Sequence, residues 1–308
     1  MKIIKRMLRY CTDSDYRFLF NSSKGLTKWL SDRQFIIRRF HAAHGYYPDL
    51  DNPVTFSEKL QWLKLYDHDP LYTMLVDKAE VRNYVECRIG NKYLVPLIDI
   101  WDRAEDIDFS RLPDQFVLKC THDSHGLVIC KDKNHLDKAQ AVKKLKSSLR
   151  KNYYSKFREW PYKNVKPRII AEAYLDGGEK GLTDYKVHCF NGEPKFILVC
   201  GSRFTEKGLT QDFYSCDWDS LQVKRPHIPH SEHGYQKPEK LEELLELSRT
   251  LSAGIPFVRA DFYIVDDEIF FGELTFFPAS GFARFEPESY DRLFGDYLKL
   301  PAHDTNQK

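Results

Sequence analysis

The chain has 308 residues, of which 42% are hydrophobic and 30% charged, and its formal net charge is +2. This composition excludes a disordered chain and is typical of a folded enzyme or binding module with a substantial core. The small net charge creates no global field for nucleic acid, so we expect no nucleic-acid partner. Seven cysteines without a CxxC pair predict reduced, mostly buried thiols and argue against structural zinc.

The N-terminal region, residues 1–90, is predicted to be mostly helical. Its first residues are basic, and no apolar run of signal-peptide or membrane-span length occurs in the chain, so we expect a cytoplasmic protein. The basic start allows peripheral contact with an anionic membrane surface or with membrane-bound machinery, and a solvated helix start is the alternative. The basic residues are Lys2, Lys5, Arg6 and Arg9.

Two helices are predicted at the end of this region. Thr55 is a suitable N-cap for the first helix, with Glu58 as its capping-box partner, and Pro70 is expected to end it. The second helix is expected over 71–89 and to close on Gly90, because glycine is the common residue past a helix end.

Short strand-length runs begin at residue 91 and predict a small lid subdomain over 91–170. The runs are YLVPLIDIW, QFVLKC, LVICKD and RIIAEAYL, with a charged helical stretch over 135–152 between the last two. The remaining residues, 171–308, are expected to form a larger, antiparallel C-terminal sheet. The sequence therefore predicts an α+β protein made of three regions.

Two hairpins are predicted in the C-terminal region. Asn191-Gly192 separates the runs DYKVHCF and PKFILVC, and this dipeptide is the strongest short-range hairpin signal. An amphipathic helix follows, with Pro238 in its first turn and Gly254 past its end. The second hairpin is the stretch RADFYIVDDEIFFGELTF, 259–276.

The second hairpin carries charges against its local β-propensity. Asp261 and Glu273 are 12 residues apart, so a three-residue loop over 266–268 places them side by side on one face, together with Arg259. Opposed carboxylates repel unless a cation lies between them, and Mg²⁺ or Mn²⁺ prefers such oxygen ligands. The alternative is a pair of edge-strand surface charges with Arg259 as their salt-bridge partner, and the spacing alone does not separate the two.

Two lysines lie on strands between apolar residues, which is typical of surface lysines that snorkel. Lys186 shares a face with Asp184, and Lys119 precedes the loop THDSHG. Together with the carboxylate pair, the two lysines indicate a phosphate site. His122 and His125 of the loop lack a third spaced metal ligand, so a loop that covers a ligand is the preferred interpretation.

These segments, in this order, resemble the ATP-grasp superfamily, and within it the TupA-like (teichuronopeptide biosynthesis) family that accompanies bacterial surface-polysaccharide genes. The resemblance covers nearly the whole chain, from HGYYPDLDNPVTFSEKLQWLKLYDHDPLYTMLVDKAEVRNYV through FVLKCTHDSHG, AEAYLDG and DYKVHCFNGEPKFI to RADFYIVDDEIFFGELTFFPASG. It implies an ATP-grasp fold, with ATP bound between the lid and the larger sheet.

The resemblance also implies roles for individual residues. Lys78 and Lys119 are expected to contact the ATP phosphates, and THDSHG to cover them, although its single glycine departs from a glycine-rich loop. The adenine is expected at the backbone of Ala173 and Leu175 and at Glu172. The further implied contacts are Asp184 to the ribose, Lys186 to phosphate or the intermediate, Arg259 to an anion, and Asp261, Glu273 and Thr275 to magnesium.

The implied reaction is ATP-dependent ligation of a carboxylate to an amine through an acyl phosphate. The expected substrate is a uronic acid or amino-acid carboxylate of surface-polysaccharide biosynthesis, which becomes an amide. A sugar phosphotransferase is one alternative, and a nucleotide-binding polysaccharide-assembly or glycosyltransferase partner is another. Arg203, Arg284 and Trp160 are further candidates for substrate contact, each equally consistent with an ordinary surface or packing residue.

Overall fold

The computed structural model describes residues 2–178, 181–201 and 208–302, so Arg203 lies outside the described residues. The α-helices are α1 (Lys2–Thr12), α2 (Ser14–Ser23), α3 (Asp32–His44), α4 (Phe56–Tyr66), α5 (Leu71–Val76), α6 (Val81–Ile89), α7 (Lys138–Leu149), α8 (Tyr154–Phe157), α9 (Leu241–Ser252) and α10 (Ser289–Tyr297). The strands are β1 (Leu97–Trp101), β2 (Phe116–Cys120), β3 (Leu127–Cys130), β4 (Ile169–Ala173), β5 (Asp184–Phe190), β6 (Glu193–Gly201), β7 (Thr210–Ser215), β8 (Phe257–Val265) and β9 (Glu268–Thr275).

The N-terminal region is helical, as predicted, but the helix expected over 71–89 is broken into α5 and α6. The carboxylate of Asp77 accepts hydrogen bonds from the backbone N–H groups of Ala79 and Glu80, at 2.8 and 3.4 Å. An aspartate that captures nearby backbone donors competes with the helix, which explains the break. Helix α4 has the predicted capping box, yet it ends at Tyr66, and Pro70 instead precedes α5.

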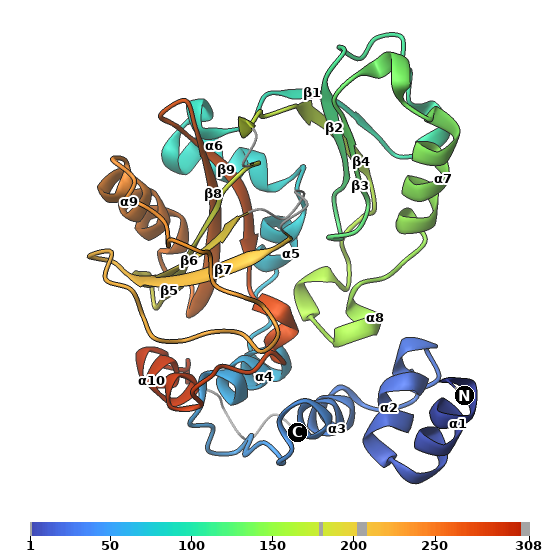
Figure 1. The fold of residues 1–308 in the computed structure, drawn as a ribbon, viewed down its shortest axis with the longest axis vertical. Helices are drawn as coiled ribbons and strands as arrows, with labels where there is room; N and C mark the ends of the chain where they lie inside the picture. Colours follow the sequence, from blue (N-terminus) through green and yellow to red (C-terminus); the bar gives the residue numbers. More distant parts are fainter. Residues whose placement is uncertain (1, 179–180, 202–207, 303–308) are drawn as a thin grey trace.

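The strands form two separate antiparallel sheets (Figure 1). The smaller sheet has the order β1-β4-β2-β3, and helix α7 packs against β2 and β3. The larger sheet has the order β7-β6-β5-β8-β9. The lid boundary predicted at residue 170 falls inside β4, because the smaller sheet extends to Ala173.

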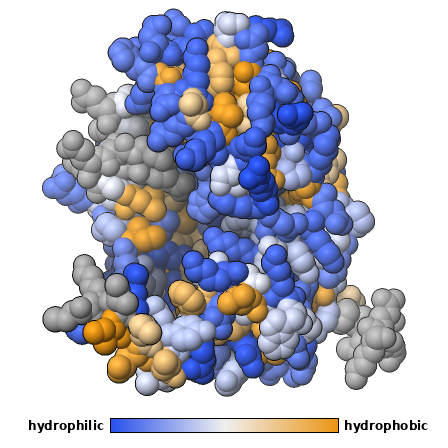
Figure 2. Space-filling view, turned by 90° about the vertical axis from the view of Figure 1, so that its right-hand side faces the viewer, coloured by the Kyte–Doolittle hydropathy of each residue, from blue (hydrophilic) through white to orange (hydrophobic). Residues whose placement is uncertain are grey.

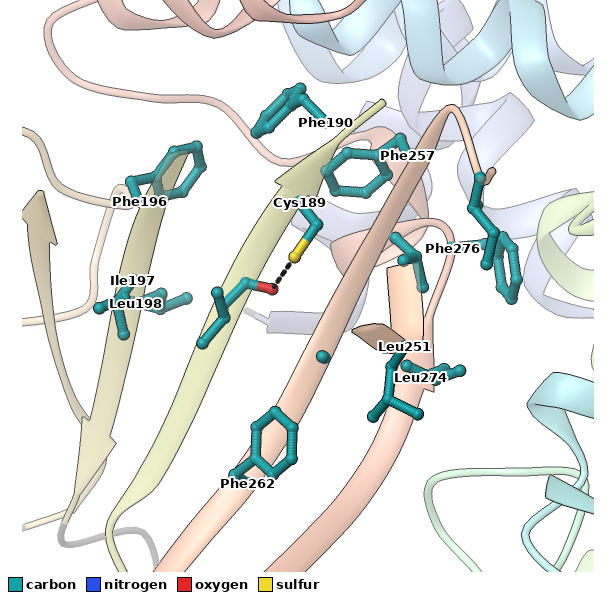
Figure 3. Close-up of a cluster of buried hydrophobic side chains, with 14 of the residues drawn as sticks. Cys189, Phe190, Phe196, Ile197, Leu198, Leu251, Phe257, Phe262, Leu274 and Phe276 are labelled. Carbon is teal, nitrogen blue, oxygen red and sulfur yellow. Dashed lines mark hydrogen bonds between the residues drawn. The ribbon is translucent and has the colours of Figure 1, made fainter. Parts of the chain in front are cut away.

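The larger sheet presents one face to helix α9, where the main core lies. Side chains from neighbouring strands pack together there, including Phe262 of β8 and Leu274 of β9, with Leu251 of α9 (Figure 3). Val258, Ala260 and Phe262 are all fully buried. Because strand residues alternate between faces, Arg259 and Asp261 point to the opposite side.

The second hairpin has the predicted strands but not the predicted loop. The turn is the two-residue Asp266-Asp267, both at positive φ, and Glu268 already pairs with Val265 in the ladder. The register then shifts by one residue, because Phe262 pairs with Phe271 and Asp261 with Glu273, which leaves Gly272 as the extra residue of a bulge. Asp261 and Glu273 therefore lie opposite each other, as predicted, through a bulge instead of a three-residue loop.

All seven cysteines are free thiols, and four of them are buried. Within the described ranges, no helix combines the length and apolarity needed to cross a membrane.

Candidate active site

The face of the larger sheet opposite α9 carries a cluster of charged side chains in neighbouring rows. Lys186, Asp261 and Glu273 form one row across β5, β8 and β9. Arg259 and Thr275 pair in the next row, and Asp184 pairs with Tyr263 on the other side. The sheet register thus brings together the predicted sites of these three strands.

Asp261 is held by two cations of the protein. Arg259 donates from Nε and Nη2 to its two oxygens, each at 2.6 Å, and Lys186 Nζ lies 2.5 Å from Oδ2. The side chain of Asp261 is 3% exposed, so these contacts compensate its burial. The repulsion expected between the two carboxylates is therefore balanced by arginine and lysine. The alternative of two edge-strand surface charges is wrong for Asp261, which is buried, but Arg259 is the salt-bridge partner that this alternative named.

Glu273 is the more accessible carboxylate of the pair, with a side chain that is 33% exposed. Lys78 Nζ lies 3.3 Å from Oε2, and the Thr275 hydroxyl donates to Oε1 at 3.3 Å. Desolvation acts to raise the pKa of Glu273, but attraction to Lys78, Lys186 and Arg259 outweighs it and lowers the pKa to about 2. Glu273 is consequently a carboxylate at all physiological pH values.

The turn between α5 and α6 positions Lys78 against the predicted phosphate loop. The Lys78 backbone N–H donates to the carbonyl of Thr121, and its Nζ donates to the carbonyl of Asp123 at 3.1 Å. Lys78 thereby connects the loop to Glu273 on the larger sheet.

The loop THDSHG, residues 121–126, is anchored at its base and exposed at its tip. Asp123 accepts from the Gly126 N–H at 2.8 Å and from the Ser148 hydroxyl. His122 is 3% exposed, and its Nε2 lies 3.2 Å from the carbonyl of Ser148 in α7. His122 therefore holds the loop against α7, whereas Ser124 and His125 are exposed at the tip.

Lys119 reaches the site from the smaller sheet. Its Nζ donates to Glu172 at 2.6 Å, and Arg82 donates to the other oxygen of Glu172 at 2.9 Å. Glu172, predicted to contact adenine, is therefore engaged by two cations and orients Lys119.

The first of two cavities beside the charged cluster has a volume of about 480 Å³ and a mainly apolar lining. Three of the predicted nucleotide contacts, Lys119, Ala173 and Leu175, line it, whereas Glu172 and Asp184 are not among its lining residues. The lining residues are Val95, Val117, Lys119, Leu127, Ile129, Lys131, Ala173, Tyr174, Leu175, Gly177, Gly178, Gly181, Leu182 and Tyr263.

The second cavity has a volume of about 660 Å³, and its lining mixes apolar residues with polar ones, among which basic side chains outnumber acidic ones. Lys186, Arg259 and Glu273 form one wall, and the predicted substrate residue Arg284 lies in another. Its residues are Ala43, Ser124, Lys186, Leu198, Gln211, Arg225, Pro226, His227, Ile228, Arg259, Glu273, Pro278, Ala279, Phe282, Ala283, Arg284 and Glu286.

Strand β8 connects the two cavities. Tyr263, Asp261 and Arg259 are two residues apart and share one face; Tyr263 lines the first cavity and Arg259 the second, with Asp261 between them. The charged cluster therefore lies at the junction of an apolar cavity and a basic one.

Sequence reasoning missed several of these residues. Tyr263 was detectable from the period-two alternation that placed Arg259 and Asp261. Arg82 follows Lys78 by four residues in the sequence, but its contact with Glu172 depends on how α6 packs beside β4. Trp160 stacks on His68, with ring centroids 4.8 Å apart, and lines neither cavity.

The chemistry of the donor set fits a magnesium ion. Asp261, Glu273 and Thr275 present oxygen atoms from adjacent rows of one face, and Mg²⁺ commonly binds through one or two carboxylates plus phosphate. Both oxygens of Asp261 are engaged by Arg259 and Lys186, so a metal ion would compete with these two cations for this ligand. Among the described residues, no group of three or more His, Cys, Asp or Glu side chains is arranged to hold a metal ion.

The family described as TupA-like ATPgrasp matches residues 58–299, and the chain belongs to this family. This assignment confirms the predicted resemblance, and with the antiparallel sheets it confirms the α+β ATP-grasp fold. No curated protein matches the sequence.

Several solved structures are similar to the chain. The D-alanine–D-alanine ligase from Bacillus anthracis complexed with ATP has 14% identity over 66% of this chain and 53% of its own, with a TM-score of 0.38. The D-cycloserine synthetase DcsG has 12% identity over 75% and 72%, with a TM-score of 0.41. The ADP complex of purK, an N5-carboxyaminoimidazole ribonucleotide synthetase, has 16% identity over 80% and 57%, with a TM-score of 0.39. The chain spans less than two thirds of the D-alanine–D-alanine ligases that it matches.

Proposed function

We propose that this protein is an ADP-forming ligase that uses ATP to join a carboxylate to an amine. The observation that carries the proposal is strand β8, along which Tyr263, Asp261 and Arg259 lead from an apolar cavity to a basic one. Phosphoryl transfer needs positioning and neutralisation of charge more than covalent help from the protein, and the cluster between the cavities supplies both.

ATP occupies the first cavity in this proposal. Its size and apolar walls suit the adenine, which the backbone of Ala173 and Leu175 contacts. Asp184 lies outside the lining but pairs with Tyr263, which belongs to it, and contacts the ribose in this proposal. Lys119, oriented by Glu172, and Lys78, oriented by the loop carbonyl of Asp123, contact the phosphates. Lysines suit this role because each supplies a point charge without a fixed geometry.

A magnesium ion bound with the nucleotide would supply positive charge to the transferring phosphoryl group. Asp261 and Glu273 would hold the ion, and the Thr275 hydroxyl beside Glu273 would be a weaker, neutral oxygen donor. Arg259 and Lys186 move from Asp261 to the phosphate oxygens, so that each anion keeps a cationic partner throughout. Before the nucleotide binds, Arg259 and Lys186 therefore balance the negative charge of Asp261.

The second cavity receives the acceptor carboxylate beside Arg259, with Arg284 as a further contact. A carboxylate oxygen attacks the γ-phosphorus, and ADP leaves to give an acyl phosphate. The amine nitrogen then attacks the acyl carbon, and inorganic phosphate leaves. A volume of about 660 Å³ has room for a sugar acid as well as an amino acid, which agrees with amidation of a glycan precursor in surface-polysaccharide biosynthesis.

The test is a screen for ADP release with Mg²⁺ and ATP, in which amino acids and uronic-acid sugars are offered with amine partners. A ligase releases ADP and inorganic phosphate in equal amounts, and added hydroxylamine traps the acyl phosphate as a hydroxamate. A phosphorylated acceptor without free phosphate would replace this proposal with a sugar phosphotransferase. Tight ATP binding without turnover on any acceptor would favour a nucleotide-binding assembly protein.

A further inference from the structure

Helix α1 turns an apolar face to solvent. Ile4, Met7 and Leu8 have the spacing i, i+3 and i+4, which places them on one side of the helix. Their exposed fractions are 66%, 65% and 64%. A helix of a globular protein normally packs such a face against the core.

The contacts of α1 with the rest of the protein come from other residues. Arg9 pairs with Asp13 at 3.1 Å and lies over the ring of Tyr16. The Tyr10 hydroxyl donates to Asn21 at 3.0 Å. Helix α1 is thus attached to α2 through polar and aromatic contacts, and its apolar face is left available.

The charge of α1 indicates whether a second copy of the chain or a lipid surface covers this apolar face. Lys2, Lys5, Arg6 and Arg9 are basic, and the helix has no acidic residue. A second copy of the chain in a two-fold contact would bring two such basic helices together and would be opposed by repulsion. An anionic lipid surface instead attracts the basic side while the apolar side enters the boundary of the acyl chains.

More apolar side chains are exposed close to α2. Leu26 is 62% exposed and Trp29 is 76% exposed, and the Leu26 N–H donates to the carbonyl of Asn21, the residue that also binds Tyr10. Figure 2 shows hydrophobic patches on the lower part of the molecule, where the N-terminal helices lie. Tryptophan is enriched at membrane interfaces because its ring is amphipathic.

We propose that α1 lies in the plane of an anionic membrane surface, with Ile4, Met7 and Leu8 inserted at the boundary between headgroups and acyl chains. This attachment is independent of the proposed ligase reaction, because α1 contributes no residue to either cavity.

The test is co-sedimentation of the full chain with vesicles of phosphatidylcholine, with or without phosphatidylglycerol. Wild-type protein binds the anionic vesicles, binds the neutral ones more weakly, and is released by added salt. Met7→Glu/Leu8→Glu lowers the vesicle partition coefficient about tenfold or more, and Lys5→Gln/Arg6→Gln has a similar effect on anionic vesicles only. Leu293→Glu, at a 42% exposed leucine of α10, is the matched control and binds as wild type does.

The unfolding temperature of each variant is measured in parallel. The substituted side chains are exposed, so the variants should melt as wild type does. If Met7→Glu/Leu8→Glu unfolds, binding of Lys5→Gln/Arg6→Gln to anionic vesicles tests the proposal. Failure of the wild-type chain to bind anionic vesicles would overturn the proposal, as would equal binding by the glutamate variant. A wild-type dimer in light scattering that Met7→Glu/Leu8→Glu dissociates would assign the face to a second copy.

Discussion

The two faces of strand β8 obey different rules. On one face Val258, Ala260 and Phe262 are fully buried against the core that α9 covers. On the other, Arg259 and Asp261 are nearly as buried but lie among charges that balance one another. One strand therefore carries both the core and the site, and its charged face depends on pairing, whereas its apolar face depends on area removed from water.

The largest effect is expected at Glu273. Glu273→Gln removes a charge that the proposed metal requires, and we expect turnover to fall by about 10²-fold to 10³-fold or more. The free energy of unfolding should change by less than about 1 kcal/mol, because the side chain is one-third exposed. Steady-state ADP release and urea unfolding measure the two effects, and ADP release near the wild-type rate would remove Glu273 from the metal site.

The apolar face should show the reverse behaviour. Phe262→Ala should lower the free energy of unfolding by about 3–5 kcal/mol, because it opens a cavity in a close-packed core. Activity per folded molecule should stay close to wild type, and Phe262→Leu is the milder control. If Phe262→Ala loses turnover while its stability is unchanged, the two faces are not separate in function.

Lys119 tests the phosphate contact from the smaller sheet. Lys119→Met keeps the aliphatic stem and removes the charge, so ATP binding should weaken by about 1.5–3 kcal/mol. The unfolding temperature should change little, since Glu172 retains Arg82 as a partner. Calorimetric titration with ATP measures the effect, and Lys166→Met, at an exposed lysine, is the control. A large loss of stability at normal ATP affinity would make Lys119 structural.

The smallest effect is expected at Thr275, whose hydroxyl accepts from Arg259 at 3.1 Å and donates to Glu273. Thr275→Val removes both hydrogen bonds and should raise the activation free energy of turnover by about 0.5–1.5 kcal/mol. Thr275→Asn should remain active, because an amide oxygen is also a suitable neutral ligand. A Thr275→Val variant as inactive as Glu273→Gln would make the hydroxyl a direct metal ligand.

The sequence alone predicted the pairing of Asp261 with Glu273 because a hairpin fixes which residues meet. It did not predict the bulge at Gly272, which changes the register by one residue and compensates for the shorter turn. The spacing of residues along one segment does not reveal a bulge. Here the turn was one residue shorter than predicted and the bulge added one residue, so the predicted pairing was still correct.

The compensation of Asp261 by Lys186 lay beyond the sequence because the two residues are far apart in the chain and meet only where β5 pairs with β8. The break between α5 and α6 has a local cause, Asp77, but the helical periodicity of the sequence favoured one continuous helix. Contacts between distant parts of the chain explain this break as well, because Arg168 binds Asp77 at 2.9 Å and supports the turn that presents Lys78.

The most direct test of the account is a crystal structure of the protein with Mg²⁺ and a non-hydrolysable ATP analogue. We expect Arg259 and Lys186 to contact phosphate oxygens, with a metal ion bound by Asp261 and Glu273 and the adenine beside Ala173 and Leu175. If Arg259 keeps both of its hydrogen bonds to Asp261 while the metal and phosphates bind elsewhere, the cluster is a structural ion pair and the proposed site is wrong.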